Sequence, residues 1–174
     1  TERLLLESGV PAYLLDGDNV RLGLNADLGF SNEDRAENIR RLGHVAALFA
    51  HSSTVCLVSA ISPFAADRKK ARQAADALGC PFIEIFVDTP LEECIRRDTK
   101  GLYAKAQRGE IAEFTGISSP YEPPADPDLV IRTAETPPIE AAKLCAGYIE
   151  ALFELHAMLP VLCETARAAG EKIM

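Results

Sequence analysis

Two aspartates flank a glycine in the stretch LLDGDNVR, which runs from Leu14 to Arg21. The apolar residues Ala12 to Leu15 predict a buried strand, so Asp16 and Asp18 would stand directly after its carboxyl end. Two interpretations of the pair remain open. Asp-Gly is a common turn dipeptide, whereas two carboxylates at such a strand end would also hold a hydrated Mg²⁺ or orient a hydroxyl group.

Three further polar groups lie near the same predicted strand end. Arg21 follows the aspartates, while Arg35 and Asn38 are three positions apart and therefore share one face of a predicted helix, near its amino end. Helical arginines are commonly solvated and nothing more. If the three groups converge, however, they would suit a phosphate or a sulfate, which the helix dipole also favours.

A basic segment runs from Arg96 to Gly116, RRDTKGLYAKAQRGEIAEFTG, in a chain whose net charge is -8. Between Arg96 and Arg108 the segment holds five basic residues and one acidic residue, Asp98. It is either a solvated run of charge or a lid that closes over a polyphosphate and excludes water. Phe30 and Phe114 stand in glycine-containing loops. They would either stack on a base or pack as satellites of the core.

The elements that must position these residues alternate along the chain. Strands are predicted at 12–15, 54–61, 82–88 and 129–132, and helices at 32–50, after Pro63, from Thr89 to about 98, and at 139–155. Capping boxes are predicted at Ser31 and Thr89. The helix after Pro63 would expose its charged side, which includes Asp67 and Arg68. Such alternation predicts an α/β protein with three α/β/α layers and a parallel sheet, with ligands beyond the carboxyl ends of the strands.

One domain is expected from 174 residues, with residues 1–156 forming it and residues 157–174 a helical tail. The net negative charge argues against nucleic acid or an anionic membrane as a partner. The uncharged run 42–66 is split by His51 to Thr54, so a membrane span is not expected. Five widely spaced cysteines predict free thiols in a reducing cytoplasm, and the three histidines form no zinc or Ser-His-Asp pattern.

Taken together, the motifs resemble the adenylyl-sulfate kinase (APS kinase) family in order and spacing, over about residues 11–155. They are LDGDNVR (15–21), LGF (28–30), DRAENIRR (34–41), ISPF (61–64), FVDTPLEECIRRD (86–98), KGLYAKA (100–106) and GEIAEFTGISSPYEPP (109–124). The resemblance implies a P-loop NTPase-like kinase fold. It also implies transfer of the ATP γ-phosphoryl group to the 3′-hydroxyl of adenosine 5′-phosphosulfate, which gives 3′-phosphoadenylyl sulfate (PAPS) in sulfate activation, with Mg²⁺ as cofactor.

The resemblance further implies a cytoplasmic homodimer, in some members fused to or associated with ATP sulfurylase. It assigns roles to individual residues of this chain. The implied catalytic residues are Asp18 beside the accepting hydroxyl, Asp16 near Mg²⁺ and Lys100 from the lid. The implied substrate-binding residues are Asp18, Arg21, Phe30, Arg35, Asn38, Ile61, Ser62, Lys100, Glu113 and Phe114, with the two phenyl rings enclosing the adenine, and Arg96 and Arg97 lie on the ATP side of the lid.

One departure concerns the ATP side. The family carries a G-x-x-x-x-G-K-[ST] loop ahead of the DGDN strand, whose amides and lysine hold the ATP phosphates, and residues 1–174 contain no Gly-Lys dipeptide. The first nine residues correspond to the end of the family's first helix, so the first strand and the Walker A loop would lie upstream. Three readings stay open: part of an active kinase, a non-catalytic nucleotide-binding or regulatory module, or another small-molecule or nucleoside monophosphate kinase.

Overall fold

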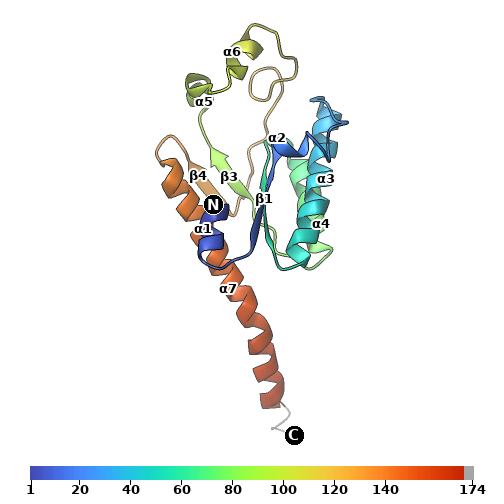
Figure 1. Ribbon diagram of the computed structural model, residues 1–174, viewed down its shortest axis with the longest axis vertical. Helices are drawn as coiled ribbons and strands as arrows, with labels where there is room; N and C mark the ends of the chain where they lie inside the picture. The colour runs from blue at the N-terminus through green and yellow to red at the C-terminus, as the bar shows by residue number, and fades with distance from the viewer. Residues whose placement is uncertain (171–174) are drawn as a thin grey trace.

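The computed structural model describes the backbone of residues 1–170 and the side chains of residues 1–154 (Figure 1). Helices and strands alternate along the chain, as predicted. The elements are α1 (Glu2–Glu7), β1 (Ala12–Asp16), α2 (Gly17–Val20), α3 (Asn32–His51), β2 (Val55–Ser59), α4 (Ala65–Asp76), β3 (Ile85–Asp88), α5 (Leu91–Arg97), α6 (Leu102–Gln107), β4 (Leu129–Arg132) and α7 (Pro138–Gly170).

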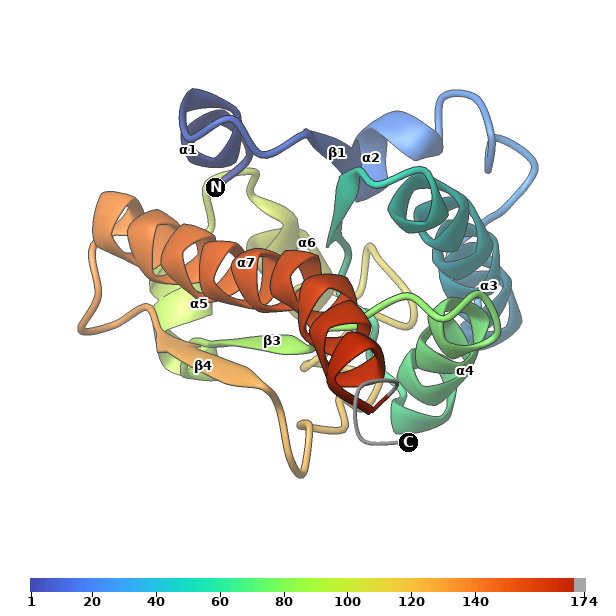
Figure 2. The same cartoon turned by 90° about the horizontal axis from the view of Figure 1, so that it is seen from below.

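All four strands are parallel, which confirms the predicted class. β1 pairs with β2 from Ala12 opposite Val55 to Asp16 opposite Ser59, and β3 pairs with β4 from Ile85 opposite Leu129 to Asp88 opposite Arg132. They form two separate two-stranded sheets instead of one continuous sheet, and Figure 2 shows the two pairs apart. Within residues 1–170, β2 and β3 therefore each keep one edge without a ladder partner.

Apolar side chains alternate along β1 and β2 and pack against helices on both faces. On one face Leu5 of α1 and Ile149 of α7 form a buried cluster with Ala12, Val55 and Leu57 against it. On the other face Leu15 packs with Ile39 and Leu42 of α3, and Cys56 lies beside them. The result is the predicted order of helix, sheet and helix layers.

Some predicted boundaries were wrong at the level of single residues. Ser31 does cap α3, because its hydroxyl accepts the amide of Asp34 at 3.1 Å. Thr89 does not cap α5; its hydroxyl instead lies 2.5 Å from that of Thr133, and Pro90 holds the cap position with no side-chain hydrogen bond.

The third strand is also shorter than predicted, because side chains occupy its first backbone groups. The carbonyl of Phe82 accepts from Arg72, and the amide of Glu84 donates to the carboxylate of Asp128 at 2.7 Å. These contacts replace ladder hydrogen bonds, so β3 begins only at Ile85.

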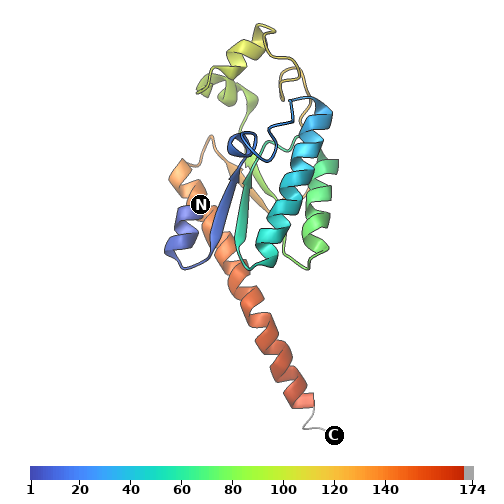
Figure 3. The same cartoon turned by 45° about the vertical axis from the view of Figure 1, so that its right-hand side comes forward.

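The last helix crosses the predicted boundary between residues 156 and 157. α7 is one continuous helix from Pro138 to Gly170, and its carboxyl-terminal part extends beyond the body of the molecule (Figures 1 and 3). The predicted end of this helix at residue 155, ahead of the helical tail, was therefore wrong. The division into a domain and a tail stays a prediction, and residues 171–174 lie outside the described residues.

Candidate functional site

The Asp-Gly-Asp turn joins the end of β1 to the short helix α2. Asp16 caps α2, since its Oδ1 accepts the amides of Asp18 at 3.0 Å and Asn19 at 3.2 Å. A Cβ on Gly17 would lie 2.8 Å from the carbonyl oxygen of Ser59, at the end of β2. The glycine is therefore required for the two strand ends to lie so close. The turn is real, and it also brings the exposed carboxylate of Asp18 to the strand ends.

The basic segment reaches over this turn. The ammonium group of Lys100, between α5 and α6, lies 2.5 Å from Oδ2 of Asp18, and both side chains are exposed. The Asp18 carboxylate raises the pKa of Lys100. In Figure 1, α5 and α6 lie together above the strand ends from which α2 begins. The interpretation of the segment as a lid is thus consistent with its position.

Asp98 holds the start of α6 and was not singled out in the sequence. Its two carboxylate oxygens accept the amides of Tyr103 and Ala104, each at 3.0 Å, and these hydrogen bonds lower the pKa of Asp98. Lys100 stands in the turn between Asp98 and α6. The capping rule gives no signal for it, because Asp98 lies three residues ahead of Gly101, the N-cap residue of α6.

Arg21 fixes the loop that carries Phe30. Its guanidinium donates to the carbonyls of Leu28 at 3.1 Å and Gly29 at 2.7 Å, and lies over the Phe30 ring at 4.5 Å from the centroid. The Phe30 ring is 64% exposed. An aromatic ring held by a cation and open to solvent offers a stacking surface.

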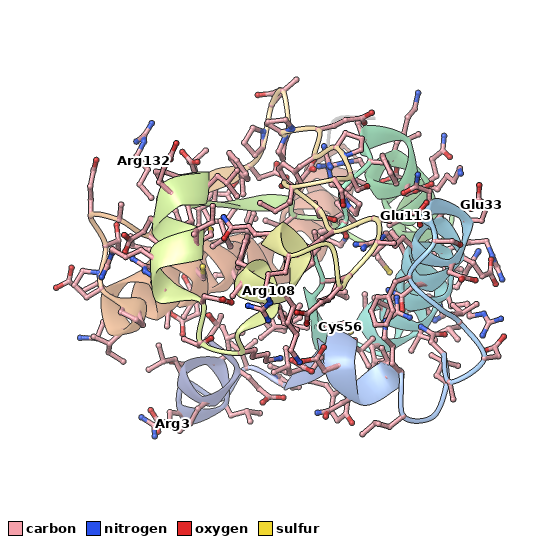
Figure 4. The ribbon with its side chains drawn as sticks, turned by 90° about the horizontal axis from the view of Figure 1, so that it is seen from above. Arg3, Glu33, Cys56, Arg108, Glu113 and Arg132 are labelled. Carbon is pink, nitrogen blue, oxygen red and sulfur yellow. The ribbon has the colours of Figure 1, made fainter. Side chains whose placement is uncertain are left out.

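Arg35, in the first turns of α3, connects this loop to the end of the basic segment. It donates to the carbonyl of Phe30 at 2.9 Å, to the carbonyl of Glu113 at 2.7 Å and to the hydroxyl of Thr115 at 2.9 Å. Partial burial and, to a lesser degree, the charge of Arg21 lower the pKa of Arg35. Seen from above, the labelled Glu113 lies beside α3, close to the labelled Glu33 (Figure 4).

Phe114 lies in a compact turn next to these contacts. Its amide donates to the hydroxyl of Ser118, and its ring meets the edge of Tyr103 of α6 with 5.0 Å between centroids. Within the described side chains the rings of Phe30 and Phe114 are not in contact with each other. Arg35 nevertheless places both residues around one side of the site.

Asn38 is buried rather than open to solvent. Its Oδ1 accepts from Nδ2 of Asn25 at 2.9 Å, and Asn38 is only 6% exposed. Asn25 is fully buried and was missed, because a single Asn in the loop LGLNADLGF carries no periodic signal. Asn38 therefore supports the loop between α2 and α3, and its role in binding stays a prediction.

Ile61 and Ser62 follow β2, beside the Asp-Gly-Asp turn. Ile61 is exposed, and Ser62 has a positive φ of 44°. Arg68 donates to the Ser62 carbonyl at 2.8 Å and pairs with Glu84 at 2.6 Å, with only 11% of the arginine side chain exposed. The prediction that Arg68 and Asp67 form an exposed side of α4 was wrong, since Asp67 is 6% exposed.

Arg96 and Arg97 lie on α5 and are not brought to Asp18 in the described part of the chain. Both donate to Glu93, and Arg97 also donates to the Thr133 carbonyl at 2.9 Å, after β4. These hydrogen bonds lower the pKa of Glu93 to about 2. In Figure 4, the labelled Arg132 of β4 lies on the opposite side of the view from the labelled Glu113. The contact of Arg97 with Thr133, directly after β4, places Arg97 beside that strand.

The site offers carboxylates to a divalent cation, but these carboxylates alone do not complete its coordination shell. Within the described residues no group of three or more histidine, cysteine, aspartate or glutamate side chains gathers at one point. Mg²⁺ is commonly held by one or two carboxylates together with waters and substrate phosphates. Asp16 and Asp18 fit that arrangement, since only Oδ1 of Asp16 accepts backbone amides and the ion pair of Asp18 with Lys100 is exposed to solvent.

Comparison with known proteins gives the same assignment as the motifs. The model of the family described as adenylylsulphate kinase matches residues 1–132. The chain belongs to this family. The adenylyl-sulfate kinase of Emericella nidulans is 53% identical over 155 residues, which cover 86% of this chain and 75% of that protein.

A sequence and a solved structure from Mycobacterium tuberculosis extend the comparison. The bifunctional enzyme CysN/CysC is 62% identical over 128 residues, covering 74% of this chain but only 21% of that protein. The structure of the APS kinase CysC in complex with AMPPNP and APS has a TM-score of 0.79, is 56% identical and covers 83% of each chain. The P-loop NTPase-like α/β fold is therefore established. Among the residues that the structure describes, no helix is long and apolar enough to cross a membrane.

Proposed function

We propose that this chain provides the acceptor half of an adenylyl-sulfate kinase, which phosphorylates the 3′-hydroxyl of adenosine 5′-phosphosulfate. The observation that carries the proposal is the contact of Lys100 with Asp18 at the strand ends. Asp18 lies three positions before Arg21, whose guanidinium covers the exposed ring of Phe30. Family membership supports the reaction class. The relative solved with AMPPNP and APS supports the pair of nucleotides.

The proposed roles follow from the chemistry of each group. Asp18 orients the accepting hydroxyl or takes its proton, and Lys100 offsets negative charge beside it. Arg21 and Arg35 face the phosphosulfate group, with Asn38 on the ribose side, because guanidinium groups bind such anions in pairs of hydrogen bonds. Phe30 and Phe114 enclose the adenine, with Ile61, Ser62 and Glu113 at its border.

Catalysis in this proposal rests on positioning and charge neutralisation. Mg²⁺, held partly by Asp16 when bound, would supply positive charge to the transferred phosphoryl group. Arg96 and Arg97 would contact ATP from the lid. To do so they must break their hydrogen bonds to Glu93 and Thr133 and bind the phosphate oxygens or the base of ATP instead. ATP is thus expected on the side of β3 and β4, with its transferred phosphoryl group toward Asp16 at the end of β1.

The ATP phosphates need a loop that residues 1–174 do not include. Each of the four strands has one edge without a ladder partner within the described residues, and we infer that the loop belongs at the edges of β2 and β3. Val58 and Val87, on these two strands, are 42% and 60% exposed, which is unusual for strands of a parallel sheet. One parallel strand with the phosphate loop at its carboxyl end would complete both edges.

The proposal also covers the cellular location and the protein partners. Cys56, Cys80, Cys94 and Cys145 are free thiols, which agrees with a reducing cytoplasm. A longer bifunctional relative supports fusion to, or association with, a second sulfate-activating enzyme such as ATP sulfurylase. A homodimer, and a boundary between residues 156 and 157, complete the proposal.

Calorimetric titration of the 174-residue chain tests the acceptor half directly. Adenosine 5′-phosphosulfate should bind, and AMP should bind more weakly because it lacks the sulfate. Addition of the phosphate loop upstream should then give ADP release that depends on adenosine 5′-phosphosulfate. Binding without turnover in that extended chain would favour the non-catalytic module, and turnover with AMP in preference would favour a nucleoside monophosphate kinase.

A further inference from the structure

The segment 113–119 is attached to the first turn of α3 by side chains that the motif comparison leaves without a role. The hydroxyl of Thr115 accepts from Arg35 at 2.9 Å, across 80 positions of sequence. Ser119, which is 7% exposed, lies 3.5 Å from Asn32. Thr115 is the one side-chain partner of Arg35 in the described part of the chain, since its other two acceptors are backbone carbonyls.

The hydrogen-bond capacity of Arg35 shows what this contact does. A guanidinium carries five N–H donors. Phe30, Glu113 and Thr115 take one donor each, from Nε, Nη2 and Nη1. Two donors remain among the contacts described, one on each terminal nitrogen, which is the pair that a bidentate anion contact uses.

Thr115 is also the acceptor that can be removed without changing the backbone. The carbonyls of Phe30 and Glu113 are present whatever the side chains are, and Glu113 holds its carbonyl with a positive φ of 53°. Thr115 is half-buried, and its hydroxyl holds Nη1 of the Arg35 guanidinium group. Loss of its hydroxyl would leave the guanidinium held only by these two carbonyls, with Nη1 no longer fixed by a side chain.

We propose that Thr115 is a positioning residue that orients the Arg35 guanidinium so that its two remaining donors face the anionic group of the bound nucleotide. This inference rests on the proposed function, because it takes Arg35 as the contact for the phosphosulfate. Thr115 itself acts through Arg35 and touches no substrate atom. It is therefore expected to affect anion recognition more than base recognition.

Three variants of the 174-residue chain separate this role from general loosening. Thr115→Val removes the hydroxyl at almost constant shape, Thr115→Ser keeps a hydroxyl, and Thr54→Val makes the same change ahead of β2, where no side-chain hydrogen bond is described. Thr115→Val should lower the affinity of the chain for adenosine 5′-phosphosulfate about tenfold, which is the loss expected for a hydrogen bond to a charged group. The affinity of Thr115→Val for adenosine should fall less than twofold. Thr115→Ser and Thr54→Val should bind both ligands as tightly as the parent chain does. Equal weakening of both ligands would overturn the proposal.

A second measurement needs no ligand. In ¹⁵N-labelled protein the Arg35 Nε–H, which donates to Phe30, should exchange severalfold faster with solvent in Thr115→Val than in the parent chain or Thr115→Ser. An unchanged exchange rate would show that Thr115 does not hold Arg35 and would overturn the positioning role. If the parent chain fails to bind adenosine 5′-phosphosulfate, the proposed function fails and the anion role of Thr115 with it. The exchange rates then still decide whether Thr115 orients Arg35.

Discussion

Lys100 Nζ lies 2.5 Å from Asp18 Oδ2, although the two residues are 82 positions apart in the chain. The contact joins the turn between α5 and α6 to the turn after β1. Because both side chains are exposed, it is a weak tether that salt will screen. It places a cation of the basic segment and a candidate catalytic carboxylate together.

Lys100→Met should therefore loosen the lid without unfolding the protein. Amide hydrogen exchange in residues 98–108 is expected to rise roughly twofold to fivefold at low salt, in line with the modest strength of exposed ion pairs. Lys105→Met on α6 is the matched control, since no ion pair of Lys105 is described in the structure. The difference between the two variants should vanish in about 1 M salt; a difference that persists there would exclude the ion pair as the tether.

Asp18→Asn should separate binding from chemistry. In a chain extended upstream to include the phosphate loop, the rate of ADP release should fall roughly 100-fold to 10,000-fold, the usual contribution of a general base. Binding of adenosine 5′-phosphosulfate should change only a few-fold, because the amide keeps the shape of the carboxylate. Asp76→Asn, at the exposed end of α4, should leave both quantities unchanged. Near-normal turnover of folded Asp18→Asn would remove Asp18 from the proton-accepting role.

Gly17→Ala should lower stability through a backbone clash. The added Cβ would meet the Ser59 carbonyl at 2.8 Å, so the ends of β1 and β2 must separate at a cost of about 1–3 kcal/mol. For a chain of this size the melting temperature should fall by roughly 2–10 °C. Gly23→Ala is the control, because a Cβ there meets no atom within 4 Å. Equal melting temperatures for the two variants would show that the strand ends can relax freely.

The turn at Gly17 was the most predictable part of the site. An apolar run ending in Asp-Gly-Asp locates a strand end and a turn by local rules, and the capping of α2 by Asp16 follows from the same residues. The contact of Asp18 with Lys100 was not available from such rules, since it depends on where the chain returns 82 residues later. Only the resemblance to a family brought the two together.

Arg68 and Asn25 show the opposite case. The run DRKKAR on α4 is polar at nearly every position, so no periodic pattern marks Arg68 as the residue that turns inward to Glu84. Burial of such groups depends on partners from distant segments, which pair them and offset their desolvation. The separation of β2 from β3 likewise has no local signal, because each strand is apolar and β-branched as in a continuous sheet.

The buried pair Asn25 and Asn38 should behave as a unit in stability. Asn25→Ala removes the donor to Asn38 Oδ1 and should cost about 1–3 kcal/mol, because a buried acceptor is left without its partner. Asn38→Ala should cost a similar amount. The double variant should lose less than the sum of the two, with a coupling above about 0.5 kcal/mol in urea unfolding. Strict additivity would mean that the two amides do not interact in solution.

Protonation of Glu93 should lower the stability of the fold at acidic pH. Hydrogen bonds from Arg96 and then Arg97 lower its pKa from 4.5 to about 2. Because the folded value lies below the unfolded one, the stabilising contribution of Glu93 is fully present above pH 4.5 and is lost as the pH falls toward 2. The ¹³C shift of the Glu93 carboxyl should titrate with a midpoint near 2, and replacement of Arg96 and Arg97 by Ala should move that midpoint toward 4.5. A parent midpoint already near 4.5 would show that the two arginines are free of Glu93 in solution, and so available to ATP without the exchange of partners proposed above.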